Sequence, residues 1–378
     1  MTKRNIAGAG IVGQSNPSCQ RSCWQLRGNK DRWYRKLERA MSSWSPPALL
    51  GLDVEAVRET LMSAALRRES WLLHPCATVI IDEGERPASA HARLAVWAAA
   101  NVPSSTAEEM GGLTLDAPTW VWGHQGSFIL APGTQRLRET AEHAGSSPSV
   151  PVSLPVPDPW GDSFVHREEF GDLAEHAWWN RTALPPEGEA RLAADIHALL
   201  RAEHALAAVL PDAAAWVTDV TRVVVPLAGS PTPSGSFRSG TLAGLPGVAL
   251  IEVTTQPLLV MEALVHESAH LHFHLEETEA PFFEESDTRL YDSPLRPDPR
   301  PLRGIFLAYH ALGYMCAMYE DWLSATGDGR CAEALEGLRG SRDDARATLE
   351  RAAADGLTED GRRFLRLCEE YVDRELPT

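Results

Sequence analysis

The sequence predicts a mainly α-helical protein with a small antiparallel β element. Apolar residues recur at three- and four-residue spacing over most of the chain, as they do on the buried face of a helix. The period changes only around residues 220–226 and 247–253, where β-branched residues follow one another as in buried strands. With 378 residues, of which 44% are hydrophobic, the chain is long enough to bury a substantial core.

Helical periodicity is present on both sides of these strands. Residues 46–143 are mainly helical in pattern, and residues 188–210 form a further amphipathic segment. The stretch 146–159, SSPSVPVSLPVPDP, holds proline too often for a helix or a central strand, so it is expected to connect two subregions. After the strands, we expect helices over residues 257–276 and 302–325, followed by two more before the C-terminus.

These patterns divide the chain into three regions. Residues 1–45, rich in Gly, Ser, Asn and basic residues, are expected to form a flexible N-terminal extension. Residues 46–200 form a helical N-terminal region, which is the natural place for substrate recognition. Residues 201–378 contain the candidate catalytic motif and form the metal-binding region.

The extension contains Gly-Ala-Gly-Ile-Val-Gly at residues 8–13, which matches the dinucleotide-binding G-x-G-x-x-G pattern. That site needs a strand before the glycines and a helix after them. Only seven residues precede this segment, and Ser-Asn-Pro-Ser at residues 15–18 interrupts any helix after it. The pattern therefore does not indicate a nucleotide cofactor.

Charge and cysteine content limit the partners and the compartment. The chain has 35 Lys and Arg against 52 Asp and Glu, a formal net charge of −17, which repels nucleic acid. Its six cysteines are scattered without a C-x-x-C pair, as in proteins of a reducing compartment. No apolar stretch is long enough for a signal peptide or a spanning helix. We expect a cytoplasmic protein with no nucleic-acid or membrane partner, and the sequence leaves the oligomeric state open.

The strongest chemical motif is His-Glu-Ser-Ala-His at residues 266–270. His266 and His270 are four residues apart on one helix, which brings their Cβ atoms to about 6 Å and allows both imidazoles to hold one ion. Glu267 completes H-E-x-x-H, in which the carboxylate acts on a metal-bound water or orients a ligand. The motif lies on an apolar helix directly after a two-strand unit, as in zincin-type sites.

Two further histidines follow on the same helix. His274 lies eight residues after His266, about 12 Å along the axis, so His266, His270 and His274 cannot all reach one ion. His272 is rotated by about 200° from His270 and faces another side. We expect both to be polar residues of the helix end or partners that support the ligands.

A third protein ligand must come from outside this helix, and the residues leave several candidates. His310 is an ionisable residue in an otherwise apolar helix, and it is equally well explained as a hydrogen-bonded core histidine. Glu320 lies about 15 Å further along that helix, so His310 and Glu320 can hardly serve together. Glu284 and Glu285, on the intervening loop, are the third option.

A proline-rich loop, residues 291–304, separates the two helices. It reads YDSPLRPDPRPLRG, and its prolines force an extended course. Arg296, Arg300 and Arg303 along it offer fork-shaped donors to a carboxylate. They are alternatively explained as ion-pair partners of the acidic run 276–287.

With this loop the chain resembles the H-E-x-x-H-domain proteins encoded with ribosomally made, post-translationally modified peptides. The resemblance consists of V-H-E-x-x-H-L after a P-G-V-A-L strand, then Y-x-S-P-L-R-P-D-P-R-P-L-R-G leading into a helix, then LTEDGRRFL at residues 357–365. It covers about residues 205–370. The sequence departs from the family's pattern at Ser268-Ala269 and in the placing of His310 after Gly304.

The resemblance implies a metalloenzyme that tailors a precursor peptide, using Fe(II), 2-oxoglutarate and oxygen to hydroxylate a side-chain β-carbon. It implies that His266 and His270 bind iron and that Arg296 or Arg300 binds the 2-oxoglutarate carboxylate or the substrate. His310 is our candidate for the third metal ligand, although its departure from the family's pattern leaves that position open. Two histidines and one further ligand leave three positions on iron, enough for bidentate 2-oxoglutarate and oxygen.

Two other functions fit the same motif. In a zinc metallopeptidase, Glu267 takes a proton from the zinc-bound water that cleaves a peptide bond. In a non-catalytic peptide-binding protein, the metal is only structural. The oxygenase is favoured because the chain carries the arginine loop and lacks both an obvious secretion signal and the third-ligand motif of the best-known H-E-x-x-H peptidases.

Overall fold

The structure is a computed structural model of the chain. It describes residues 29–44, 51–67, 88–115, 119–123, 126–130, 133–146, 189–221, 223–227, 239–241, 247–278 and 280–372, together with residues 69, 72 and 80. The G-x-G-x-x-G segment and the proline-rich stretch 147–159 lie outside the described residues. The described part is mainly helical, as predicted, and no helix in it is long and apolar enough to cross a membrane.

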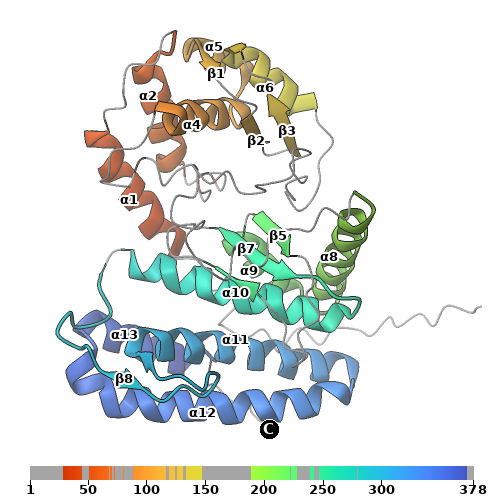
Figure 1. The fold of residues 1–378 in the computed structure, drawn as a ribbon, viewed down its shortest axis with the longest axis vertical. Helices are drawn as coiled ribbons and strands as arrows, with labels where there is room; N and C mark the ends of the chain where they lie inside the picture. The colour runs from red at the N-terminus through yellow and green to blue at the C-terminus, as the bar shows by residue number, and fades with distance from the viewer. Residues whose placement is uncertain are drawn as a thin grey trace, which may run out of the picture.

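The N-terminal part combines helices with short strands (Figure 1). Its elements are α1 (Asn29–Ser43), α2 (Val54–Leu66), α4 (Ala88–Ala100), α5 (Ser104–Glu109), β1 (Gly112–Leu115), β2 (Thr119–Gly123), β3 (Gly126–Leu130), β4 (Gly133–Arg136) and α6 (Leu137–Ser146). Strand β1 pairs antiparallel with β4, and β2 pairs antiparallel with β3. The sequence predicts the helices here but not the strands, because each strand has only four or five residues and shows no sustained alternation.

Part of the predicted N-terminal extension is folded. Helix α1 buries Trp33, Tyr34, Leu37 and Met41, which recur at helical spacing and contribute to the main core. The Trp33 indole also donates to the Leu72 carbonyl at 2.9 Å. Helix α1 contacts both α2 and α10, so this segment joins the N-terminal part to the helix that carries the candidate motif.

The sheet beside the motif is mixed, whereas the sequence predicts an antiparallel element. Strands β5 (Val223–Leu227) and β7 (Val248–Glu252) match the two predicted strands and pair in parallel. The short strand β6 (Ser239–Gly240) lies between them in sequence and pairs antiparallel with β7, giving the order β5-β7-β6. Parallel pairing is possible because the connection from β5 to β7 is far longer than a hairpin turn. Antiparallel pairing holds for the two-stranded sheets β1–β4 and β2–β3 and for the hairpin β8 (Leu290–Tyr291) with β9 (Arg300–Pro301).

Helices pack in successive layers beside this sheet (Figure 1). The C-terminal part contains α8 (Glu189–Val209), α9 (Pro211–Val220), α10 (Pro257–Glu277), α11 (Leu302–Thr326), α12 (Arg330–Gly356) and α13 (Glu359–Val372). Helix α10 contacts β7, α8 and α9 on one side and α11 on the other, and α11 packs on α12 (Figure 1). Helix α8 runs continuously through residue 200, so the boundary predicted there falls inside a helix.

The segment between α10 and α11 contains the β8–β9 hairpin, and its first residues are held by Thr358 and by helix α13. Thr358 donates a backbone hydrogen bond to the Phe282 carbonyl at 3.1 Å, and its hydroxyl donates to the Pro281 carbonyl at 2.6 Å. Phe282 packs against Phe364 of α13, with the ring centroids 4.8 Å apart. The LTEDGRRFL segment therefore holds residues 281–282, which follow the end of α10 and precede the β8–β9 hairpin.

Candidate metal centre

The helix of the motif is buried on several sides. Helix α10 starts with Pro257, which suits the first turn because the missing N–H would have no partner in the helix. His266 and His270 lie one turn apart, with their ring centroids 4.5 Å apart and their planes nearly perpendicular. The structure thus brings together the two histidines that the sequence places on one face.

Both imidazoles are held in the neutral form. Burial, together with a smaller effect of the positive charge of Arg296, lowers the pKa of His266 to about 4. Burial also lowers the pKa of His270 well below its usual value, with smaller contributions from His266, His274, His310 and Arg303. A metal-binding histidine must be unprotonated, so this environment favours metal binding at neutral pH.

Glu267 is buried on the other side of the motif, with only 1% of its surface exposed. Burial raises the pKa of its carboxyl to about 8, although hydrogen bonds with Ser239 and Thr241, at strand β6, act in the opposite direction. Its Oε1 atom lies 3.6 Å from His266 Nε2. Its Oε2 atom is buried and has no hydrogen-bond partner among the described residues. The carboxyl is therefore anchored to the edge of the sheet and borders the ring nitrogen of His266.

The small residues inside the motif have a packing role. The Ser268 hydroxyl shares a 2.7 Å hydrogen bond with the Thr221 hydroxyl, and both side chains are buried. Ala269 is fully buried as well. Ser268 thus ties the centre of α10 to the end of α9, which bulkier side chains at residues 268–269 would prevent.

His310 is placed against His272 of α10. His310 Nε2 lies 3.1 Å from His272 Nδ1, the two rings are stacked with centroids 5.0 Å apart, and both side chains are 1% exposed. The other ring contacts of His310 are with Phe273, Tyr314 and Phe364. This is the arrangement of a hydrogen-bonded core histidine, the alternative that the sequence leaves open. His272 is likewise a buried residue rather than a polar residue of the helix end.

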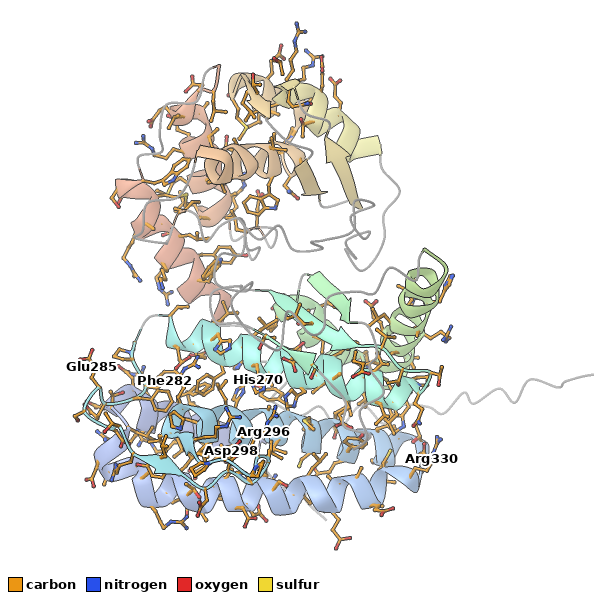
Figure 2. The ribbon with its side chains drawn as sticks, in the orientation of Figure 1. His270, Phe282, Glu285, Arg296, Asp298 and Arg330 are labelled. Carbon is orange, nitrogen blue, oxygen red and sulfur yellow. The ribbon has the colours of Figure 1, made fainter. Side chains whose placement is uncertain are left out.

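The other acidic candidates for a third ligand lie elsewhere. Glu320 binds the Arg339 guanidinium, with Oε1 2.6 Å from one of its nitrogens. Glu284 and Glu285 are exposed on the loop after α10, and Figure 2 labels Glu285 there. Across the described parts of the chain, no group of three His, Cys, Asp or Glu side chains converges as a complete metal site.

The arginines of the loop differ in their partners. Arg303 binds Glu277 through three contacts of 2.6–3.2 Å and also reaches His274 Nδ1 at 3.0 Å. It is thus the ion-pair partner of the acidic run, as the alternative explanation predicts. His274 belongs to this cluster at the end of α10.

Arg296 and Arg300 are exposed, and neither has an ion-pair partner among the residues that the structure describes. The charge of Arg296 acts on His266, so this guanidinium lies on the side of the histidine pair. Figure 2 shows Arg296 and Asp298 on the segment that crosses α11, on the same side of α10 as His270. The stem of Arg300 packs over Gly304, where an added Cβ would lie 3.3 Å from Arg300 Cβ. Arg296 is therefore the loop arginine with a free guanidinium near the motif.

Helix α11 contributes two contacts that sequence reasoning missed. Met315 Sδ lies 3.0 Å from His266 Nδ1. One turn further, the Tyr319 hydroxyl donates a short hydrogen bond to Glu262, one turn before His266. Both contacts follow from the antiparallel packing of α10 on α11, which pairs residues 266 and 262 with 315 and 319. Neither Met nor Tyr at these positions carries a recognisable sequence signal.

The residues present fit a metal ion held by two histidines. His266 and His270 are neutral and adjacent, and His270 Nδ1 is buried without a hydrogen-bond partner among the described residues. Two imidazoles with a neighbouring carboxylate suit Zn or Fe equally well.

Comparison of the sequence with models of protein families and with curated proteins gave no match.

Proposed function

We propose that this protein is a metal-dependent peptide-modifying enzyme, an Fe(II)- and 2-oxoglutarate-dependent oxygenase that hydroxylates a β-carbon in a ribosomally made precursor peptide. Bound iron with 2-oxoglutarate would supply the oxidising power to insert one oxygen atom from O₂ into a C–H bond. His266 and His270 would hold the iron, and Glu267 would orient a ligand or the peptide. The third protein ligand is left open, since His310 pairs with His272.

The observation that carries the proposal is Arg296. Its guanidinium is exposed, has no carboxylate partner in the described part of the chain, and acts electrostatically on His266. A free arginine beside a pair of neutral histidines suits a small anion that binds next to the metal, as a carboxylate of 2-oxoglutarate would. A hydrolytic site, whose small ligand is water, does not need such a charge.

The zinc metallopeptidase remains the second candidate because of Glu267. The Glu267 carboxyl lies beside His266, and a cation bound there would lower the raised pKa so that the carboxylate could accept a proton from metal-bound water. The two functions share every residue of the motif, so their products distinguish them.

The test is incubation of the purified protein with Fe(II), 2-oxoglutarate, oxygen and the precursor peptide encoded beside its gene, followed by mass spectrometry. The oxygenase yields succinate and a peptide heavier by one oxygen atom. Two peptide fragments formed with zinc alone would overturn the proposal in favour of the peptidase. Peptide binding with no change in mass under either condition would indicate the non-catalytic alternative.

The role of Arg296 has its own prediction. The Arg296→Ala variant loses a charge-assisted contact worth about 1.5–3 kcal/mol, so the KM for 2-oxoglutarate rises by roughly 10- to 100-fold. Arg330→Ala is the matched control, because Arg330 is exposed, pairs with Asp328, and lies at the far end of α11 from the loop (Figure 2). Equal KM values for the two variants would show that Arg296 does not bind the cosubstrate.

A further inference from the structure

The contact between Met315 and His266 fixes which ring nitrogen of His266 can bind a metal. Sδ of Met315 lies 3.0 Å from Nδ1, within hydrogen-bonding distance for sulfur. A thioether carries no proton and can only accept, so this contact is a hydrogen bond only if Nδ1 carries the proton. A neutral imidazole has one N–H, and the lone pair is then on Nε2.

The opposite side of the ring supports this assignment. His266 Nε2 faces Glu267, with Oε1 at 3.6 Å, on the side where the carboxyl of the motif is anchored to β6. Glu267 is also too far from Nε2 for a hydrogen bond. Nε2, the nitrogen of His266 that does not contact Met315, is thus the one that lies beside the Glu267 carboxyl.

Met315 is held in place beside His266 Nδ1 by the packing around it. Its side chain is 5% exposed, on a stretch of α11 that is buried from Ala308 to Tyr319. His266 has no other hydrogen-bond acceptor at Nδ1 among the described residues. In metal sites the second nitrogen of a histidine ligand usually donates to a carboxylate or a carbonyl, and this donation sets the tautomer and the ring orientation.

We propose that Met315 is a positioning residue, whose thioether accepts the Nδ1 proton of His266 and thereby presents Nε2 to the metal. The binding of a metal by Nε2 rests on the proposed function. The tautomer of His266 does not, because it can be observed in the metal-free protein. A sulfur acceptor in place of an oxygen also leaves the imidazole less electron-rich, since thioethers are weak acceptors.

The first experiment reads the tautomer without metal. The protein is labelled with ¹⁵N at histidine, stripped of metal with a chelator, and studied by long-range ¹H–¹⁵N correlation NMR, with His266 assigned from the spectrum of His266→Gln. The wild type is expected to show the Nδ1–H tautomer at His266. Met315→Leu, of similar size but without an acceptor, is expected to lose it, and Met315→Gln, whose amide oxygen accepts, is expected to restore it.

The second experiment measures affinity with Co(II) alone, by titration of its visible absorption. Met315→Leu is expected to bind Co(II) about 10- to 100-fold more weakly than the wild type, the usual cost of losing such a partner. Met318→Leu is the matched control, because Met318 is buried on the same helix, whereas the described hydrogen bond of His266 Nδ1 is with Met315. Thermal unfolding of all variants shows whether they are folded.

The outcomes separate this inference from the proposed function. An Nε2–H tautomer at His266 in the wild type, or equal Co(II) affinity in folded wild type and Met315→Leu, overturns the role of Met315 while leaving a metalloenzyme possible. An Nδ1–H tautomer in a protein that binds no Co(II) overturns the metal centre and with it the role of Met315 as a positioning residue. The expected tautomer together with weaker binding in Met315→Leu supports both.

Discussion

At the scale of single residues, Glu267 is the group whose ionisation depends most on the fold. Burial raises the pKa of its carboxyl to about 8, from 4.5 for an unperturbed glutamate, so the metal-free fold favours the protonated form. The stability that this gives is fully present below pH 4.5 and is lost as the pH rises through 8, because a charged carboxylate must then be buried. The half-buried His266 and His270 give the opposite pH dependence, since their lowered pKa values favour the folded state more as the pH rises.

This gives a prediction for Glu267→Gln in the metal-free protein. The amide keeps a neutral polar group near Ser239 and Thr241 and cannot ionise. The melting temperature of the variant relative to the wild type should therefore increase between pH 4.5 and pH 8. Even one pKa unit of this shift corresponds to about 1.4 kcal/mol, and each kcal/mol to about 2–4 °C, so the gain should be at least about 3 °C.

Calorimetry or fluorescence-monitored melting at intervals of pH measures this difference directly. Subtracting the wild-type curve removes the contribution of the histidines, which both proteins share. Glu285→Gln, at an exposed loop position, is the control for a change of charge alone. If the difference in melting temperature between Glu267→Gln and the wild type is constant over this range, the pKa of the Glu267 carboxyl is not raised by burial.

At the scale of elements, the antiparallel packing of α10 on α11 decides which residues reach the motif. The 3.6-residue period predicts both helices and the shared face of His266 and His270. It does not predict the register between two helices, which depends on how side chains interdigitate at their contact. That register places Met315 opposite His266 and His310 beside His272. The sequence could therefore not decide whether His310 binds a metal or pairs with a core residue.

The first turn of α13 is a second case in which the packing of an element depends on one residue. A Cβ at Gly361 would lie 2.1 Å from the Phe282 carbonyl oxygen, closer than atoms can approach. Helix α13 can thus pack against residues 281–282, just after the end of α10, only with glycine at this position. The LTEDGRRFL segment is visible in the sequence, but its contact with residues 281–282 is a tertiary feature.

We predict that Gly361→Ala destabilises the protein by about 1–3 kcal/mol, the typical cost of overpacking, because α13 or the loop must shift. Gly340→Ala on α12 is the matched control. It has open space around the added Cβ and should be neutral or stabilising by up to about 1 kcal/mol, since alanine favours helix. Urea unfolding monitored by circular dichroism compares the two. Equal midpoints would contradict the close contact between Gly361 and Phe282.

At the scale of the whole molecule, the fold surrounds one chemical centre with elements from distant parts of the chain. Helix α1, the sheet β5-β7-β6 and helix α11 all contact α10, and they come from residues before 50, around 240 and after 300. The sequence predicts the helical character, the two main strands and the histidine pair, since these depend on local patterns. The strands β1–β4, the folding of residues 29–43 and the parallel pairing of β5 with β7 depend on contacts between distant segments.

The central claim is that His266 and His270 together hold a metal ion. The most direct test is the iron content of the protein after anaerobic reconstitution with Fe(II) and desalting, for wild type, His270→Gln and, as a control, His197→Gln on an exposed part of α8. The account predicts about one iron per chain in the wild type and in His197→Gln, and little in a folded His270→Gln, because one imidazole alone binds weakly. Equal iron in His270→Gln and the wild type, or none in the wild type with either Fe(II) or Zn(II), would contradict it.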